Sequence, residues 1–317
     1  MNPRISPWKY KITTAMAHIW GRLYKAPQPR IVILSYHSVH PTRIFRSCKP
    51  DMFEAHLQWL KENCDIIPLS SLFPIQFKDT PNAKPKVVIT FDDGYVDNYQ
   101  YAFPLLVKWG VPATFFATVG LLERHPEVMQ RFQYFRHTGM EELEPLTWKQ
   151  VQEMTDAGME FGAHTYSHPN LIYLEKPQLE FEIKEAKERM EDKIGQRVDG
   201  FAYPFGRPRC HFNNVNLDMV RRAGYKYAVA VFFRGVLTRD SQWALPRFSS
   251  NNDDVRTLAD KIKGSWDFVG YFQEWAPLWV GRVISPRAFR ASAYGPQYVP
   301  NRYHSDARRV DGIETSL

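Results

Sequence analysis

The fold of this chain is decided by the stretch Val87-Val88-Ile89-Thr90-Phe91-Asp92-Asp93-Gly94. Its apolar part predicts a buried strand, and its two adjacent carboxylates and glycine predict a turn at the carboxyl end of that strand. Farther along, the apolar segment 159–163 is followed directly by His164-Thr165-Tyr166-Ser167-His168. Side chains suited to acid–base or metal chemistry therefore follow two separate predicted strands.

The two histidines of the second motif stand four residues apart, a spacing that puts both imidazoles on one face of a turn. One carboxylate and two imidazoles make a three-ligand set that leaves a position open for water, as in catalytic rather than structural zinc sites. The second carboxylate is then available as a base beside that water. Alone, such a histidine pair would be ordinary, and the flanking motifs are what favour a catalytic metal site.

Strands and helices alternate through the middle of the chain. Apolar segments predict seven strands, at residues 30–36, 87–91, 113–119, 159–163, 200–203, 225–231 and 244–248. Helical periodicity predicts helices between them, at residues 51–63, 99–109, 147–157, 178–194, 214–223 and 253–263. The alternation predicts an α/β fold, a parallel sheet or distorted (β/α) barrel of about seven strands with its helices outside. We assign this barrel domain to residues 30–264.

The chain outside the barrel is basic at both ends. Residues 1–29 are predicted to form a basic amphipathic helix. Its apolar stripe is Trp8, Ile12, Met16, Ile19, Trp20 and Leu23, and its flanking basic residues are Lys9, Lys11, Arg22 and Lys25. A helix that caps the core fits this pattern, and so does peripheral membrane contact through residues 8–25. Residues 265–317 are predicted to be an aromatic closing segment followed by a flexible basic tail, although the aromatics could instead face a membrane or a sugar.

The net charge of +7 is concentrated at the two ends. Residues 1–30 hold six Lys or Arg and no acid, and residues 282–317 hold six Arg against three acids, so the rest carries −2. A nucleic-acid-binding protein is expected to carry its basic stripe on the folded body. The distribution therefore argues against nucleic acid as a partner and leaves a membrane surface or an acidic partner open.

Cysteine usage and hydropathy bear on location. Cys48, Cys64 and Cys210 are odd in number and show no paired spacing, which favours unpaired thiols in a reducing compartment. Neither a secretory signal nor an apolar run long enough to span a membrane is apparent in the sequence. These features predict a cytoplasmic protein that could lie peripherally at the inner face of the membrane.

Four motifs occur in a specific order: Thr-Phe-Asp-Asp-Gly (90–94), Val-Pro-Ala-Thr-Phe-Phe (111–116), Gly-Ala-His-Thr-Tyr-Ser-His (162–168) and Phe-Ala-Tyr-Pro-Phe-Gly (201–206). In this order the chain resembles the polysaccharide deacetylase family, also called the NodB-homology domain or carbohydrate esterase family 4, over roughly residues 30–250. The resemblance implies a TIM-barrel-like fold and metal-dependent hydrolysis of an N-acetyl or similar N-acyl group on a sugar. The opening Leu-Ser-Tyr-His-Ser-Val (34–39) resembles the branch that deacetylates poly-N-acetylglucosamine-type polymers.

By that resemblance Asp93, His164 and His168 bind the metal, expected to be Zn²⁺, and Asp92 is the general base. The chemistry agrees, because a metal can polarise a poorly electrophilic amide carbonyl and lower the pKa of its bound water to about 7. The tetrahedral oxyanion is expected between the metal and a backbone N–H near Tyr203-Pro204.

Two departures from the family pattern matter. Phe201-Ala202 stand where the family has an arginine before the aromatic-proline pair, and Arg247 could reach Asp92 from a later strand and orient it bidentately. The late leucine-x-histidine motif that supplies the general acid is missing, and His37, after the first strand, is the best substitute because a histidine can donate a proton near neutral pH. An ordinary surface arginine and a structural core histidine remain alternatives for these two residues.

The sequence predicts a metal-dependent hydrolase that removes N-acetyl groups from an N-acetylated amino sugar in a polysaccharide or glycolipid intermediate. A second hypothesis keeps the chemistry but makes the enzyme a deformylase or amidase on a lipid- or nucleotide-linked amino sugar. A third is a degenerate, non-catalytic barrel that binds a glycan, against which the intact Asp92, Asp93, His164 and His168 argue. The absence of a Gly-x-Ser-x-Gly motif counts against a serine hydrolase.

Overall fold

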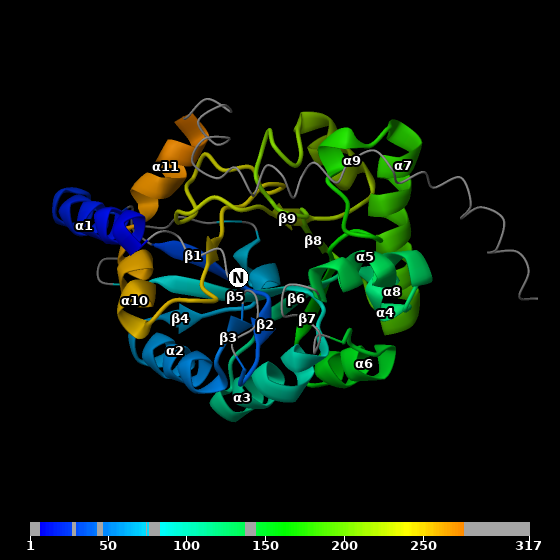
Figure 1. Cartoon of the computed structure of the whole chain (residues 1–317), viewed down its shortest axis with the longest axis horizontal. Coiled ribbons are helices and arrows are strands. Elements are labelled where there is room, and N and C mark those ends of the chain that lie inside the picture. The colour runs from blue at the N-terminus through cyan, green and yellow to red at the C-terminus, as the bar shows by residue number, and fades with distance from the viewer. Residues whose placement is uncertain are drawn as a thin grey trace, which may run out of the picture.

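A computed structural model of the chain describes residues 7–26, 30–42, 47–73, 75, 83–136 and 144–275. A curved parallel sheet lies at the centre with helices around it (Figure 1). Seven strands follow one another in the order β10-β1-β5-β6-β7-β8-β9, and β4 pairs with β5 beside that path. The strands of this sheet are β1 (Ile31–Tyr36), β4 (Asp65–Ile66), β5 (Lys86–Asp93), β6 (Thr114–Ala117), β7 (Glu160–Ala163), β8 (Gly200–Ala202), β9 (Tyr227–Val229) and β10 (Phe248–Ser249). The predicted α/β barrel of about seven strands is confirmed.

The helices follow the strands in the expected alternation. They are α1 (Pro7–Leu23), α2 (Pro50–Asn63), α3 (Phe103–Trp109), α4 (Val119–Leu122), α5 (Pro126–Arg136), α6 (Trp148–Asp156), α7 (Lys176–Glu180), α8 (Ala186–Ile194), α9 (Asn214–Arg222), α10 (Val255–Lys263) and α11 (Asp267–Trp275). Short 3₁₀ turns lie at η1 (Leu69–Leu72) and η3 (Leu171–Tyr173), and π-helical segments at η2 (Asn98–Ala102) and η4 (Phe181–Glu185). A separate two-stranded sheet joins β2 (Ser38–Val39) to β3 (Ser47–Cys48).

The barrel is closed by a short segment rather than by a full strand pair. β10 pairs with β1 through Leu34↔Phe248, on one side of the gap. On the other side β9 meets the same segment at the single bridge Val229↔Leu245, with backbone bonds of 2.8 and 2.9 Å around it. Residues 245–249 therefore span the opening between the two edges of the sheet.

The central strands are buried on both faces, as expected for a parallel sheet covered by helices. Every residue of β1 is buried, and so is every residue of β5 after its first. Packing leaves no space for a side chain at Gly162 of β7, where a Cβ would lie 2.5 Å from the Phe116 ring and 2.8 Å from the Gly200 carbonyl oxygen. The strand that leads to the histidine motif therefore requires glycine at this position.

The structure corrects some predicted element boundaries. The segment 244–248, predicted as a strand, contributes only the Leu245 bridge before β10 begins at Phe248. The helix predicted over residues 178–194 is interrupted by the π-helical η4. The predicted start of α6 is confirmed, since the Thr147 hydroxyl accepts from the Gln150 N–H and completes a capping box.

The N-terminal and C-terminal helices pack on each other beside the barrel. Trp20 of α1 lies 6.1 Å from Phe268 and 6.2 Å from Tyr271, ring centroid to ring centroid, on α11. The aromatic segment that the sequence predicted as a closing element thus forms α11 in its described part, while the predicted tail lies outside the described residues. No helix in the described ranges is long and apolar enough to cross a membrane.

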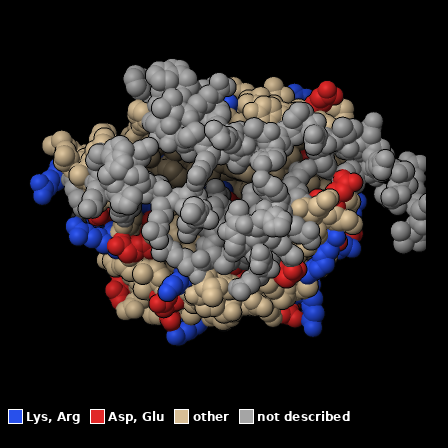
Figure 2. Space-filling model, viewed as in Figure 1, with Lys and Arg blue, Asp and Glu red and all other residues tan. Residues whose placement is uncertain are grey.

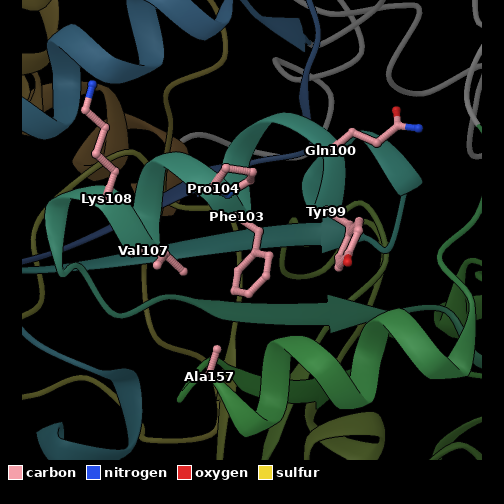
Figure 3. A pocket seen from close by; sticks show the side chains of 7 residues that line it. All are labelled: Tyr99, Gln100, Phe103, Pro104, Val107, Lys108 and Ala157. Carbon is pink, nitrogen blue, oxygen red and sulfur yellow. The ribbon is translucent and has the colours of Figure 1, made fainter.

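A shallow apolar hollow of about 640 Å³ lies on the helical shell (Figure 3). It is lined by residues of η2, α3 and the end of α6, namely Tyr99, Gln100, Phe103, Pro104, Val107, Lys108 and Ala157. None of the predicted site residues lines it. The hollow is therefore separate from the residues that carry chemistry.

Candidate active site

The carboxyl ends of the strands bring the predicted polar residues to one place. His37 follows β1, Asp92 and Asp93 end β5, and His164 follows β7. Parallel strands direct their carboxyl ends to the same edge of a barrel, where α/β enzymes build their active sites. Arg247, which directly precedes β10, reaches the same cluster from the closing segment.

Asp93, His164 and His168 form a group that could hold a metal ion. Each offers one ligand atom, and the three atoms lie within 4.8 Å of one another. The Asp93 Oδ1 atom lies 3.6 Å from His164 Nε2 and 3.5 Å from His168 Nε2. Two ligands of a tetrahedral Zn²⁺ at ordinary bond lengths would be about 3.3 Å apart, so this spacing fits a small cation after a minor contraction.

Hydrogen bonding leaves one ring nitrogen of His164 available as a metal ligand. The His164 Nδ1 atom lies 2.8 Å from the Ala202 carbonyl oxygen, which can only accept, so Nδ1 carries the proton. Nε2 of the neutral ring then has a free lone pair aimed at Asp93. A backbone carbonyl behind the ligating imidazole is a usual feature of metal-binding histidines. The His168 ring packs at 4.8 Å from Phe205, edge to face, and is 12% exposed.

The loop between the two histidines is held by a buried carboxylate. Glu182 of η4 is fully buried and accepts from the Tyr166 N–H at 3.0 Å and the Ser167 N–H at 2.8 Å. Its other oxygen accepts from the Ser167 hydroxyl. One acidic side chain thus binds three donors of the loop, and the π-helical turn of η4 is the element that presents it.

The N-terminal end of α4 holds the opposite side of this loop. The Val119 and Gly120 N–H groups donate to the carbonyls of Thr165 and Tyr166 at 3.2 and 2.7 Å. Thr165 and His168 adopt positive φ angles of 65° and 57°, which are uncommon for residues other than glycine. Such a conformation persists only where its surroundings enforce it. The two sets of contacts to Glu182 and α4 supply that enforcement.

Local backbone shape also fixes Asp93. Its φ angle is 76°, and the following Gly94 has a φ angle of 85°. A Cβ on Gly94 would lie 3.0 Å from the Ala117 Cβ, so both conformation and space require glycine there. The end of β5 therefore directs its two neighbouring carboxylates, Asp92 and Asp93, to different partners.

Asp92 is paired with Arg247. The guanidinium of Arg247 donates to both carboxylate oxygens of Asp92 at 2.7 Å, in the bidentate geometry that the sequence suggested. Arg247 also donates to the Thr90 hydroxyl at 3.0 Å and the Ala230 carbonyl at 3.2 Å, and it is fully buried. It is therefore not an ordinary surface arginine.

The pKa values of both carboxyl groups are lowered. Burial alone would raise the pKa of Asp92, but the positive charge of Arg247, with a contribution from His164, outweighs it. Burial likewise would raise the pKa of Asp93, and the charges that His37, His168 and His164 can carry bring it below its ordinary value. Both groups are therefore ionised at neutral pH.

His37 is held at the edge of this cluster by two asparagines. Its backbone N–H donates to Asn251 Oδ1 at 2.8 Å, and its carbonyl oxygen accepts from Asn98 Nδ2 at 2.9 Å. The Asn251 Nδ2 atom lies 3.4 Å from the ring Nδ1 of His37. If this amide donates to Nδ1, the neutral ring carries its proton on Nε2, so Asn251 can select the tautomer of His37.

The structure corrects the assignment of Tyr203 and Pro204 to the oxyanion site. The Tyr203 N–H already donates to the Val229 carbonyl at 3.2 Å, and proline has no N–H. The Tyr203 side chain points away from the cluster, because its hydroxyl donates to the Trp243 carbonyl and its ring stacks on Phe212 at 3.8 Å. The Tyr203 side chain therefore packs in the core rather than facing the cluster.

Phe205, next along the turn, offers another candidate N–H. Its φ angle is 60°, its ring contacts that of His168, and its N–H has no backbone partner in the described ranges. Sequence reasoning also missed Glu182 and Asn251. Glu182 lies in a helix whose apolar periodicity does not predict a buried carboxylate. Asn251 lies in a loop without any recognisable motif. Only the fold reveals them.

Comparison with known proteins agrees with this geometry. The family model described as polysaccharide deacetylase matches residues 79–228. A Bacillus subtilis (strain 168) protein, YxkH, named for the same family, is 32% identical over 221 residues, which are 69% of this chain and 70% of that protein. The chain belongs to the polysaccharide deacetylase family.

Further relatives of this polysaccharide deacetylase family member carry more specific names. A poly-beta-1,6-N-acetyl-D-glucosamine N-deacetylase of Staphylococcus aureus (strain MRSA252) is 25% identical over 268 residues, covering 81% of this chain and 85% of that protein. Among solved structures, the Streptococcus pyogenes deacetylase PplD in complex with acetate has a TM-score of 0.63 at 26% identity and covers 75% of this chain and 99% of its own. IcaB from Ammonifex degensii shares the fold, with a TM-score of 0.61 at 20% identity over 76% of this chain and 100% of its own.

Proposed function

We propose that this polysaccharide deacetylase removes N-acetyl groups from an N-acetylated amino sugar in a polymer of the poly-N-acetylglucosamine type, with Zn²⁺ held by Asp93, His164 and His168. One observation carries the proposal. An ionised carboxylate fixed by a buried arginine lies next to a second carboxylate and two imidazoles that can bind a metal. The name of the Staphylococcus aureus relative supports the choice of polymer.

The donor set fits a divalent cation. Two neutral imidazoles and one carboxylate suit Zn²⁺, and the carbonyl of Ala202 fixes the ring of His164 in the orientation that binding requires. A cation bound there would supply Lewis-acid chemistry, polarising the amide carbonyl and lowering the pKa of a water molecule. A cation with only these three protein ligands would keep a coordination position for substrate or water.

Asp92 is the proposed general base. It accepts a proton from the attacking water while a C–O bond forms at the amide carbon. Arg247 binds both oxygens of Asp92, yet each carboxylate oxygen has a second lone pair that can accept the proton. The arginine also fixes the direction of that lone pair, because the guanidinium is itself held by Thr90 and Ala230.

His37 is the proposed general acid. As the C–N bond breaks, the protonated imidazole donates a proton to the leaving amino group, and acetate and the free amine are the products. A histidine ordinarily titrates in the range needed for this step. The backbone bonds of His37 to Asn251 and Asn98 keep the ring near the carboxylate cluster. We assign stabilisation of the oxyanion to the N–H of Phe205, in place of Tyr203.

The test is acetate release from N-acetylglucosamine oligomers, by wild type and by Asp92→Asn, each with and without Zn²⁺ added after chelation. We expect metal-dependent release by wild type and its loss in a variant that still binds the metal. If wild type that holds Zn²⁺ releases formate from formylated sugars but no acetate, the deformylase hypothesis replaces this one. A wild type that binds glycan but hydrolyses neither would be the non-catalytic barrel.

A second measurement separates the roles of Asp92 and His37. Aryl acetate esters have leaving groups that need no protonation, whereas the amine of an amino sugar does. His37→Gln should therefore lose amide hydrolysis by about 10²-fold or more while largely keeping aryl ester hydrolysis. Asp92→Asn should lose both activities. Equal losses on both substrates in His37→Gln would contradict its role as the acid.

A further inference from the structure

Exposed apolar side chains gather on one helix outside the barrel. Met16, Ile19 and Leu23 of α1 are 50%, 62% and 81% exposed. They are three of the seven large apolar side chains that are exposed in the described ranges, and the other four are spread over as many elements or loops. An isolated exposed apolar residue needs no explanation, but a cluster on one surface helix does.

The spacing of these residues puts them on one face of α1. Positions i, i+3 and i+7 lie within about 60° of one another around a helix with 3.6 residues per turn. The face is directed outward because the neighbouring face of α1 is already occupied. Trp20 packs on two rings of α11, and the Tyr24 hydroxyl, just after α1, lies 2.7 Å from the Tyr271 hydroxyl.

A close contact between α1 and the turn before α11 also fixes the orientation of α1. A Cβ on Gly21 would lie 2.4 Å from the Ser265 hydroxyl oxygen, so α1 approaches the turn before α11 at backbone distance. Ala17, between these contacts, is 1% exposed. Rotating α1 to bury Met16, Ile19 and Leu23 would separate these fitted surfaces.

Charge indicates which partner the face would bind. Residues 7–25 contain four Lys or Arg and no Asp or Glu. Arg22 and Lys25 are exposed, and Arg22 lies three residues after Ile19, which makes these two side chains neighbours on the helix surface. Figure 2 shows Lys and Arg side chains together with uncharged surface at the edge of the molecule where Figure 1 places α1. An apolar stripe with basic residues beside it is complementary to a surface that is apolar beneath an anionic layer.

We propose that this outer face of α1, formed by Met16, Ile19, Leu23 and Arg22, with Lys25 just after the helix, docks on the surface of an anionic lipid bilayer. The helix lies in the plane of the interface, with its apolar side chains among the upper acyl chains and its basic side chains at the headgroups. α1 does not cross the bilayer. This role is independent of the proposed chemistry, and the sequence-based expectation of a cytoplasmic location stays a prediction.

The test is co-sedimentation of the full chain with vesicles. One set contains phosphatidylglycerol and phosphatidylcholine in equal parts, and the other contains phosphatidylcholine alone. We expect wild type to bind the anionic vesicles, and raising the salt from 0.1 to 0.5 M to weaken binding by about tenfold, because part of the attraction is electrostatic. Binding to the neutral vesicles should be weaker by a similar factor.

Matched variants separate the two contributions. Ile19→Ser/Leu23→Ser should weaken binding to anionic vesicles by about tenfold or more, because it removes the buried apolar area. Arg22→Gln/Lys25→Gln should weaken binding to anionic vesicles only. The control is Val107→Ser/Val215→Ser, which changes side chains that are 52% and 66% exposed on other helices and should leave binding unchanged.

Three results would overturn the proposal. One is failure of wild type to bind anionic vesicles, and another is equal binding by wild type and Ile19→Ser/Leu23→Ser. The third concerns a protein occupant of the face, either a second copy or another part of this chain. If Ile19→Ser/Leu23→Ser lowers the melting temperature by several degrees or changes the oligomeric state without lipid, the face is already covered by protein.

Discussion

Arg247 is the single residue on which the geometry of the site most depends. Its guanidinium carries the only positive charge that the structure places in a bidentate contact with Asp92 within the described ranges, and both partners are buried. A buried ion pair adds little to stability relative to apolar residues, but removing one partner leaves a charge without compensation. Removing one partner is therefore expected to destabilise the protein by more than the intact pair stabilises it.

We expect Arg247→Met to lower the free energy of unfolding by about 3–5 kcal/mol, because Asp92 would remain buried and unpaired. Asp92→Asn/Arg247→Met should recover part of that loss. Urea denaturation followed by circular dichroism measures both. As a control, Arg239→Met changes an arginine that is 63% exposed and should alter stability by less than about 0.5 kcal/mol. Equal losses in the single and double variants would mean that the charge on Asp92 is not the cause.

Asp97 predicts a pH dependence of stability. Burial, opposed by hydrogen bonds from Ser38 and Asn98, raises the pKa of its carboxyl from 3.8 to about 7. The folded protein then holds this proton more tightly than the unfolded chain, so the stabilisation is complete below pH 3.8 and is lost as the pH rises towards 7. Wild type should be less stable at pH 8 than at pH 5, by about 3 kcal/mol from this group.

The measurement for Asp97 is thermal or urea unfolding at both pH values. Asp97→Asn cannot ionise, so the stability difference between pH 5 and pH 8 should shrink in that variant, even if the amide is less stable at both. A pH difference of the same size in wild type and Asp97→Asn would assign the effect to other groups.

At the residue scale, sequence reasoning succeeded where chemistry requires a residue type. Asp92, Asp93, His164 and His168 were recognisable because their motifs follow strands, and the structure brings them together with Arg247 and His37. Their catalytic roles stay predictions. The structure argues against Tyr203 as the oxyanion donor because its N–H is bonded to β9, which sequence cannot reveal when the end of β8 is not located to one residue.

At the scale of elements, the histidine loop depends on the helix that follows it in the chain. η4 widens the helix by one residue, and Glu182 at this point reaches the Tyr166 and Ser167 N–H groups. π-Helical turns often mark functional positions. The periodicity of residues 178–194 does not predict this π-helical interruption, because the apolar stripe continues on both sides of it.

Glu182→Ala should weaken Zn²⁺ binding by about 10- to 100-fold, because the loop that carries His168 loses three hydrogen bonds and its strained backbone can relax. Glu182→Gln keeps an oxygen for the two N–H groups and should lose less. Isothermal titration calorimetry of the chelated protein with Zn²⁺ measures the affinity. Glu188→Ala, on a side chain that is 57% exposed in α8, serves as the control. Unchanged affinity in Glu182→Ala would show that the loop holds its shape without this carboxylate.

At the scale of the whole molecule, Asp267 joins three separate parts of the chain. It accepts from both terminal nitrogens of Arg30, before β1, at 2.9 and 2.8 Å, and from the Gly235 N–H at 3.2 Å. Asp267 itself begins α11. The closing helix is therefore fastened to the start of the barrel and to the connection after β9.

We expect Asp267→Ala to lower the free energy of unfolding by about 3–5 kcal/mol, since Arg30 would be left buried without its counter-charge. Asp218→Ala is the matched control, because Asp218 pairs with two exposed arginines and its side chain is 36% exposed. The control should change stability by less than about 1 kcal/mol. Urea denaturation of both variants is the measurement, and similar small effects would mean that α11 contributes little to the barrel.

The overall architecture was predictable because it depends on alternation repeated along the whole chain. Each apolar segment and each amphipathic helix gives the same indication, so errors at single boundaries do not accumulate. The manner of closure was not predictable in this way. The segment 244–248 has the pattern of one more strand, whereas in the structure Leu245 pairs with β9 and Phe248 pairs with β1.

This closing segment also carries Arg247, which couples the heat tolerance of activity to the closure of the barrel. Opening this segment breaks one bridge at Leu245 and leaves Asp92 buried without Arg247, so it costs free energy, but less than global unfolding does. On warming, molecules would release Arg247 from Asp92 while β5 and β7 still hold Asp93 and His164 in place. Such molecules would be inactive although still folded, and they would regain activity on cooling without having to refold.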